Sequence, residues 1–159
     1  MNDTISSHDS ASDPIGSRRH WMSVLARAPA EAIESALTRD GLLPVWTRVR
    51  GPETGLVMVR GRAGGSGSPF NLGEMTVTRC TVRLGSGDVG HAYVAGREER
   101  RAELAAVADA LLQDPTKFKV LRHTLIRPLE EAQQEQRLTR AEKAAATRVE
   151  FFSMRNMRS

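Results

Sequence analysis

The hydrophobic spacing of this chain changes twice, and these two changes restrict the fold more than any other feature of the sequence. Between residues 17 and 40 the apolar residues recur every three or four positions, which indicates amphipathic helices. Between residues 43 and 97 they alternate with polar residues, as they do in half-buried strands. After residue 97 the helical spacing returns. The sequence therefore predicts an α+β fold with its strands grouped in the middle of the chain.

Two short helices are expected before the strands. The first begins at Ser17, a suitable N-cap, and runs to about residue 28. The second begins at Pro29 and ends near Arg39, where Asp40-Gly41 is a typical helix stop.

Glycine-rich clusters at residues 51–55, 64–69 and 85–88 divide the middle segment. Three turns separate four strands, and their short connections predict an antiparallel meander. The expected strands are Leu43–Arg50, Leu56–Ala63, Gly73–Leu84 and Val89–Arg97. One sheet face is expected to be rich in arginine, and it carries Arg48, Arg50, Arg79 and Arg83.

C-terminal helices follow, including one long helix. A first helix after Arg97 has an apolar stripe that can cover the sheet, and a second ends before Arg127-Pro128. The third runs from Leu129 to about Phe152 without proline or glycine. Its first half has polar residues on almost every side, and either a partner protein that covers this half or simple solvation explains that pattern. Its second half has an apolar stripe of Leu138, Ala141, Ala145, Val149 and Phe152.

The composition predicts one domain with a flexible segment at each end. Residues 1–17 contain five serines and three aspartates but no lysine or arginine, so we expect a disordered acidic arm. Residues 18–155 form the single domain, and residues 156–159 form a flexible tail. The lone Cys80 excludes an internal disulfide, and the four histidines lack the spacing of metal ligands. No apolar run is long enough for a membrane span and no signal peptide is evident, so a cytoplasmic protein is expected.

Two segments have the residues to contact an anion. Gly64, Gly65 and Gly67 follow Arg62 in a loop whose backbone amides can approach a phosphate, although a flexible hairpin connection explains the same glycines. Arg97 follows Gly96 at a strand-to-helix junction, where it can hold a phosphate, a partner carboxylate or a surface ion pair. No pair of residues has the spacing of a catalytic centre, and no catalytic or metal-binding residue is expected in this chain.

The chain resembles the PhnG subunit family of the bacterial carbon-phosphorus lyase pathway. The match runs in order over about residues 18–155, and its strength lies in the order and spacing of many short segments. The segments that carry it are Arg19–Met22, Pro52–Val57, Gly61–Gly67, Gly73–Arg79, Val82–Leu84, Gly96–Glu98, Asp109–Leu111 and Thr147–Met154. One departure is Arg101-Ala102-Glu103, where a His-Ala-Glu can stand in the family.

The resemblance implies an accessory subunit and no solitary enzyme. Its expected partners are PhnI, PhnH and PhnJ, in a complex that converts ATP and an alkylphosphonate to a ribose 1-phosphonate 5-triphosphate with release of adenine. The iron-sulfur cluster is expected on PhnJ, and adenine displacement is expected to centre on PhnI. This chain is then expected to need no cofactor of its own.

The resemblance leaves the role of the cationic residues open. Arg62 and Arg97 are candidates for contact with substrate or with a partner subunit, as is Arg79 on the sheet face. Arg148 can instead anchor the segment around Phe151 to a neighbour. The alternative function is a nucleic-acid-binding module that presents the arginine-rich sheet face to a phosphate backbone.

Overall fold

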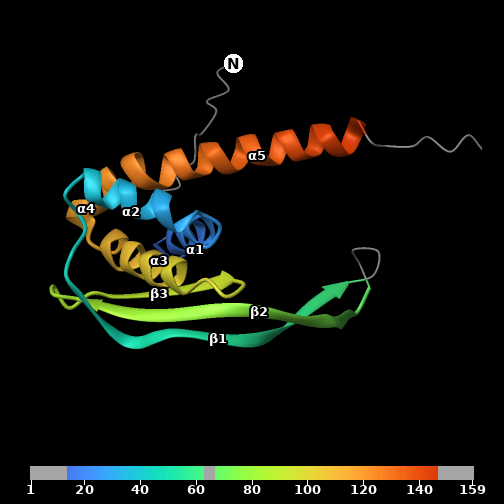
Figure 1. Ribbon diagram of the computed structural model, residues 1–159, viewed down its shortest axis with the longest axis horizontal. Helices are drawn as coiled ribbons and strands as arrows, with labels where there is room; N and C mark the ends of the chain where they lie inside the picture. Colours follow the sequence, from blue (N-terminus) through green and yellow to red (C-terminus); the bar gives the residue numbers. More distant parts are fainter. Residues whose placement is uncertain (1–13, 63–66, 147–159) are drawn as a thin grey trace, which may run out of the picture.

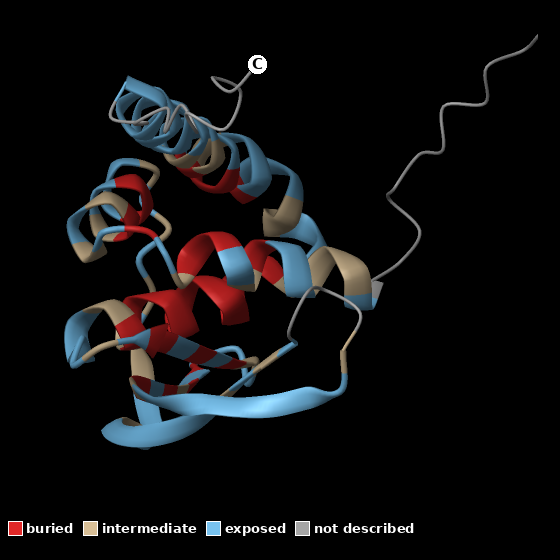
Figure 2. Ribbon diagram, turned by 90° about the vertical axis from the view of Figure 1, so that its right-hand side faces the viewer, coloured by how far each residue is buried: buried red, intermediate tan, exposed pale blue. Residues whose placement is uncertain are grey.

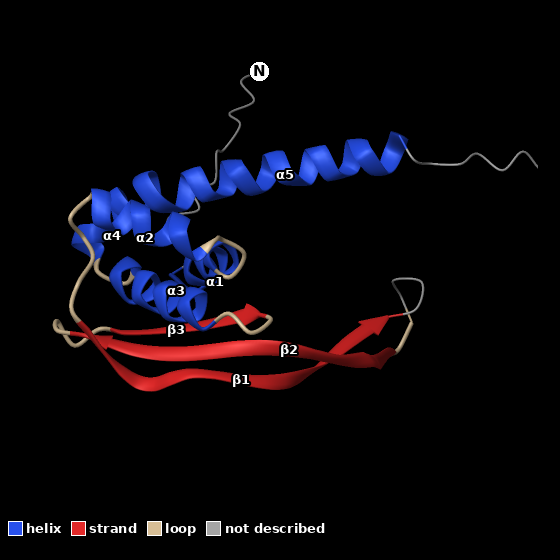
Figure 3. Cartoon of the chain, in the orientation of Figure 1, coloured by secondary structure: helices blue, strands red, loops and turns tan. Residues whose placement is uncertain are grey.

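In the computed structural model a layer of helices covers one face of an antiparallel sheet (Figures 1 and 3). The structure describes residues 14–62 and 67–146. The α+β class predicted from the spacing is therefore confirmed. No helix in these two ranges is both long enough and apolar enough to cross a membrane.

The sheet has three strands where four were predicted. They are β1 (Trp46–Arg62), β2 (Pro69–Leu84) and β3 (Val89–Ala95), in the order β1-β2-β3 with antiparallel pairing throughout. The glycine-rich cluster at residues 51–55 makes no turn, because β1 continues through it with a register shift against β2 between Arg50 and Glu53. Pro52 is tolerated there since β1 is an edge strand, and bulges absorb the irregular backbone.

The two N-terminal helices are close to their predicted positions. Helix α1 spans Pro14–Leu25 and begins three residues before Ser17, the expected N-cap. Helix α2 spans Ala30–Arg39, and Gly41 follows it with a φ of 64°. Of the predicted acidic arm, residues 1–13 lie outside the described residues.

The C-terminal helices follow a different course from the predicted one after residue 121. Helix α3 (Glu99–Leu112) ends before α4 (Pro115–Leu121), as Asp114-Pro115 predicts. The chain then passes through a π-helical turn, η3 (Arg122–Ile126), directly into α5 (Arg127–Ala146). The helix was expected to stop before Arg127-Pro128. We attribute the continuation to the wider π turn, which relieves the clash between Pro128 and the preceding carbonyls.

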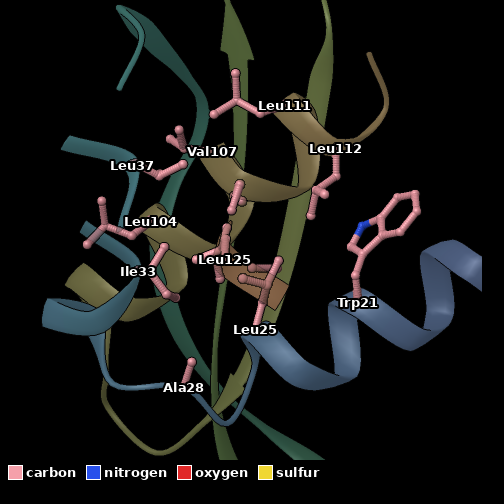
Figure 4. Close-up of a cluster of buried hydrophobic side chains, with 14 of the residues drawn as sticks. Trp21, Leu25, Ala28, Ile33, Leu37, Leu104, Val107, Leu111, Leu112 and Leu125 are labelled. Carbon is pink, nitrogen blue, oxygen red and sulfur yellow. The ribbon is translucent and has the colours of Figure 1, made fainter. Parts of the chain in front are cut away.

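Helix α3 is the centre of the core, between the sheet and the other helices (Figure 2). The largest buried side chains from α1, α2, α3 and η3 meet around it, including Leu25, Leu37, Leu111 and Leu125 (Figure 4). Helix and strand approach closely at Gly90 of β3, where an added Cβ would lie 1.9 Å from the carbonyl oxygen of Ala106. This close approach seats α3 directly on β3.

Two elements extend beyond this core. Residues 56–62 of β1 and 69–76 of β2 form a two-stranded extension, called the ribbon below, which projects from the same end of the domain as the second half of α5 (Figures 1 and 2). Residues 134–146 of α5 are exposed throughout. The predicted apolar stripe is therefore open at Leu138, Ala141 and Ala145, and its last two members lie outside the described residues.

Candidate functional site

The junction between β3 and α3 presents Arg97 on a rigid turn. Gly96 has a φ of 88°, a conformation that favours glycine. The buried Thr78 hydroxyl donates to the Gly96 carbonyl at 2.6 Å and accepts from the Glu98 amide at 3.0 Å. Arg97 itself is exposed and makes no side-chain contact within the described residues. The turn therefore offers a free guanidinium from a fixed backbone position.

Arg62 lies at the far tip of the ribbon, away from that junction. Arg62 pairs with Pro69, whereas Val77 pairs with Ala95 at the end of β3. The run of β2 from Pro69 to Val77 corresponds to about 26 Å at roughly 3.3 Å per residue. The structure thus separates Arg62 from Arg97, and the two side chains do not form one site within this chain.

Several candidate residues fall at or beyond the limits of the described structure. Gly67 lies in a bend and is half-buried. Gly64, Gly65, Arg148 and Phe151 lie outside the described residues. The loop's capacity to bind an anion and the anchoring role of Arg148 therefore stay predictions.

The predicted four-arginine face is wrong, because a bulge at Val49 turns Arg48 and Arg50 to opposite faces. Arg48 pairs with the inward-facing Val82, and Arg50 pairs with Thr81 on the outer face. Arg48 therefore reaches back to α3, where it contacts both carboxylate oxygens of Glu103 at 2.6 and 2.8 Å. Trp46 donates to the same carboxylate at 2.9 Å. The hydrogen bond from Arg48 lowers the pKa of Glu103 and keeps this ion pair charged.

Two of the three remaining outer-face arginines share one carboxylate. Glu53 accepts from Arg79 at 3.1 and 3.2 Å and forms an ion pair with Arg50 at 3.3 Å. Arg83 has no side-chain partner among the described residues. Glu53 thus offsets one of the three outer-face charges and Arg48 is turned away, so the continuous four-arginine face expected for a phosphate backbone is missing.

A buried carboxylate that the sequence analysis did not single out joins three elements. Asp109 on α3 has no exposed surface. It accepts two hydrogen bonds from Arg18 at 3.1 and 2.7 Å, one from the Trp21 indole at 2.9 Å and one from the His91 backbone amide at 2.9 Å. Asp109 therefore ties α1 and the edge of β3 to the central helix. The available signal was an acid on the apolar side of a helix otherwise rich in alanine and leucine.

A groove lies beside this buried carboxylate, between α1, α4 and the free edge of β3. It has a volume of about 1280 Å³ and an apolar wall that includes Met22 and Phe118. Arg19, Lys119 and Arg122 line it as well, and none of the three has a side-chain partner within the described residues. No aspartate or glutamate is among the described lining residues. The groove is thus apolar and positively charged, and it fits an anion that carries apolar groups.

The cysteine and two of the histidines make contacts within the fold and form no reactive cluster. Cys80 is buried and its thiol contacts the Arg50 carbonyl oxygen at 3.5 Å. Burial raises the pKa of Cys80 to about 11, which leaves it protonated at neutral pH. His91 contacts Thr81 across the strands, and His20 contacts Glu130 on α5. No cluster of three potential metal ligands exists within residues 14–62 and 67–146.

These features define an α+β domain with an exposed arginine on a fixed turn, open apolar surfaces and no constellation of catalytic side chains in its described part. The family model for "Phosphonate metabolism protein PhnG" matches residues 16–156. The chain is also 44% identical over 156 residues to a relative from Rhizobium meliloti (strain 1021), and the match covers 97% of each chain. That relative is the "Alpha-D-ribose 1-methylphosphonate 5-triphosphate synthase subunit PhnG". The chain therefore belongs to the PhnG family.

Proposed function

We propose that this chain is an accessory subunit of alpha-D-ribose 1-methylphosphonate 5-triphosphate synthase. The complex transfers the ribose triphosphate part of ATP to an alkylphosphonate and releases adenine. Its other subunits are PhnI, PhnH and PhnJ, and it works in the cytoplasm. Membership of the PhnG family and the identity to a curated subunit of that synthase support this assignment.

The observation that carries the proposal is the exposed ribbon. Two strands without a covering layer are at best marginally stable in water. Leu56 is 64% exposed and Leu72 is 61% exposed, and both faces of the ribbon carry apolar side chains because Val57 pairs with Met75 on the outer face. Monomeric proteins rarely expose apolar surface of this extent. The ribbon is therefore an interface for another subunit.

Helix α5 supplies a second part of the same interface. Leu138 is 55% exposed, and residues 134–146 in the second half of this helix are exposed throughout. Because α5 and the ribbon project from the same end of the domain, one partner can contact both (Figure 1). We assign this two-part surface to PhnI.

The free cations are assigned to contacts within the complex. The substrates and product carry triphosphate and phosphonate groups, which need cationic donors at hydrogen-bond distance. Arg97 on its fixed turn is the best placed donor in the described part of this chain. Arg62 lies about 26 Å away and belongs to the ribbon interface. Chemistry on the substrate resides in the partner subunits, where the iron-sulfur cluster is held by PhnJ.

Co-purification tests the assembly. The chain is co-produced with PhnI, and the double variant Leu56→Glu/Phe70→Glu places charges on the ribbon. The wild type is expected to co-purify with PhnI, and the variant is expected to lose at least nine tenths of the bound partner. Val45→Glu is the control, since Val45 is 85% exposed but lies at the opposite end of β1. A ribbon variant that binds PhnI as well as the control does would contradict the proposal.

Arg97→Ala separates substrate contact from assembly. If Arg97 touches substrate, the variant complex assembles normally but loses adenine release. Failure of assembly, or full activity in the assembled variant, would instead assign Arg97 to the interface or to solvent. Arg83→Ala is the matched control, because it also removes an exposed guanidinium without a partner among the described residues.

A further inference from the structure

The outer edge of β3 is open at its centre. The His91 amide donates to Asp109, so it points away from β2. The Gly96 amide donates to the Thr76 carbonyl and therefore points toward β2. Backbone groups alternate in direction along an antiparallel strand. The N–H and C=O of Tyr93, two residues after His91, thus also point away from the sheet, and nothing in the described domain bonds to them on that side.

Both ends of this edge are occupied by side chains. Gln113 donates to the Val89 carbonyl at 2.9 Å, and Arg101 donates to the Ala95 carbonyl at 3.5 Å. An added strand is therefore limited to the short stretch centred on Tyr93. Such an edge is a template for strand addition by another chain.

The groove beside this edge has positively charged side chains and apolar walls, and both can contact an added strand. Arg19, Lys119 and Arg122 line it without partners, and the nearby Asp109 is already neutralised by Arg18. The walls are mainly apolar, and in Figure 4 Trp21 projects from α1 beside Leu112 of α3. Acidic side chains suit the three cations, and alternate apolar side chains suit the wall.

We propose that this groove binds a short, extended, acidic segment of another subunit, which adds as a strand to β3 at Tyr93. The inference rests on the proposed function, because the segment comes from a partner in the synthase. It describes a second interface on a different side of the domain from the ribbon. A small phosphate ligand would satisfy the cations but would leave the apolar wall and the strand edge uncovered, so the peptide is the better occupant.

Photo-cross-linking of the assembled complex tests the proposal. The benzophenone amino acid p-benzoylphenylalanine replaces Met22 in the groove wall, and mass spectrometry identifies the cross-linked peptide. We expect one segment of PhnI, PhnH or PhnJ that is rich in aspartate and glutamate. Cross-links to residues 1–13 of this chain, to a segment without acids, or to nothing would overturn the proposal. Excess ATP is expected to leave the cross-link yield unchanged. A lower yield in the presence of ATP would assign the groove to a small anion and would overturn the proposal.

Three variants in the Met22 cross-linking background test the two recognition elements. The triple variant Arg19→Glu/Lys119→Glu/Arg122→Glu is expected to lower the cross-link yield per assembled complex about tenfold. Tyr93→Pro is expected to do the same, because it removes the edge N–H while keeping the pairing with β2. Tyr93→Ala keeps the N–H and is expected to keep the yield within about twofold. Equal yields in the proline and alanine variants would refute strand addition.

Two controls separate this inference from the proposed function. Arg83→Glu reverses an exposed charge on β2 outside the groove and outside the two-part surface assigned to PhnI, and it is expected to leave the yield per complex unchanged. Circular dichroism confirms that each variant folds. Assembly of the wild type without a groove cross-link would overturn this inference alone, whereas failure of the wild type to assemble would overturn both.

Discussion

The buried carboxylate of Asp109 is the most demanding test of the fold, since one side chain holds α1, α3 and β3 together. Asp109→Ala removes the acceptor for the Trp21 indole and for the His91 amide, and it leaves Arg18 without its counter-charge. A buried donor without a partner costs about 1–3 kcal/mol. The Arg18 side chain is 34% exposed, so water compensates part of its loss.

Together these losses come to about 3–5 kcal/mol, the range for breaking a buried ion pair. At roughly 3 °C per kcal/mol for a domain of this size, the melting temperature is expected to fall by about 10–15 °C. The assay is urea unfolding of the purified full-length chain, followed by far-ultraviolet circular dichroism. Far-ultraviolet detection is preferred because Trp21 is itself part of the cluster.

Glu135→Ala is the control, since it removes an exposed carboxylate on α5 that has no partner among the described residues. It is expected to change the free energy of unfolding by less than about 0.5 kcal/mol. The Arg18→Ala change should also cost much less in the Asp109→Ala background than in the wild type. A loss below about 1 kcal/mol for Asp109→Ala would refute the role assigned to this carboxylate.

Three further predictions follow from single contacts. Gly90→Ala is expected to destabilise the domain by more than about 3 kcal/mol in urea unfolding, because the added Cβ would lie 1.9 Å from the Ala106 carbonyl oxygen. Gly85→Ala is the control, because a Cβ added at Gly85 would have no atom within 4 Å. Burial raises the pKa of Cys80 to about 11, so this thiol is expected to resist iodoacetamide at pH 8 in the folded chain and to react rapidly in 6–8 M urea. Equal alkylation rates in the two conditions would contradict its burial. Because the hydrogen bond from Arg48 lowers the pKa of Glu103 in the folded state, its ion pair stabilises the fold above the unfolded pKa. This stabilisation is lost as the pH falls through the folded pKa, so the stability difference between wild type and Glu103→Gln is expected to shrink as the pH falls below the unfolded value of 4.5.

Local patterns in the sequence predicted the parts of the fold that local forces determine. The alternation predicted for the strands is observed in the second half of β2, where Thr78, Cys80 and Val82 are buried and Arg79 is exposed, because α3 covers one side of it. The turn predicted around Pro52 is wrong. The glycines and proline at residues 51–55 suit a turn and an irregular edge strand equally well, and pairing with β2 decided between them.

The candidate sites show the same division between local and distant contacts. The arginine face assumed strict alternation, and one bulged residue at Val49 was enough to turn Arg48 to the other side. The cluster around Asp109 joins residues 18, 91 and 109, and the groove collects cations from residues 19, 119 and 122. No spacing along the chain brings such residues together, so only the packing of α1 and α4 against α3 shows them.

Reconstitution of the reaction tests the central claim most directly. PhnI, PhnH and PhnJ are produced with or without this chain and are supplied with ATP and methylphosphonate, and the phosphorus NMR spectrum is recorded for the ribose 1-methylphosphonate 5-triphosphate product. The product is expected with the wild-type chain, and it is expected to be absent without the chain or with the ribbon variant Leu56→Glu/Phe70→Glu. Product formation at the same rate without this chain would contradict the account.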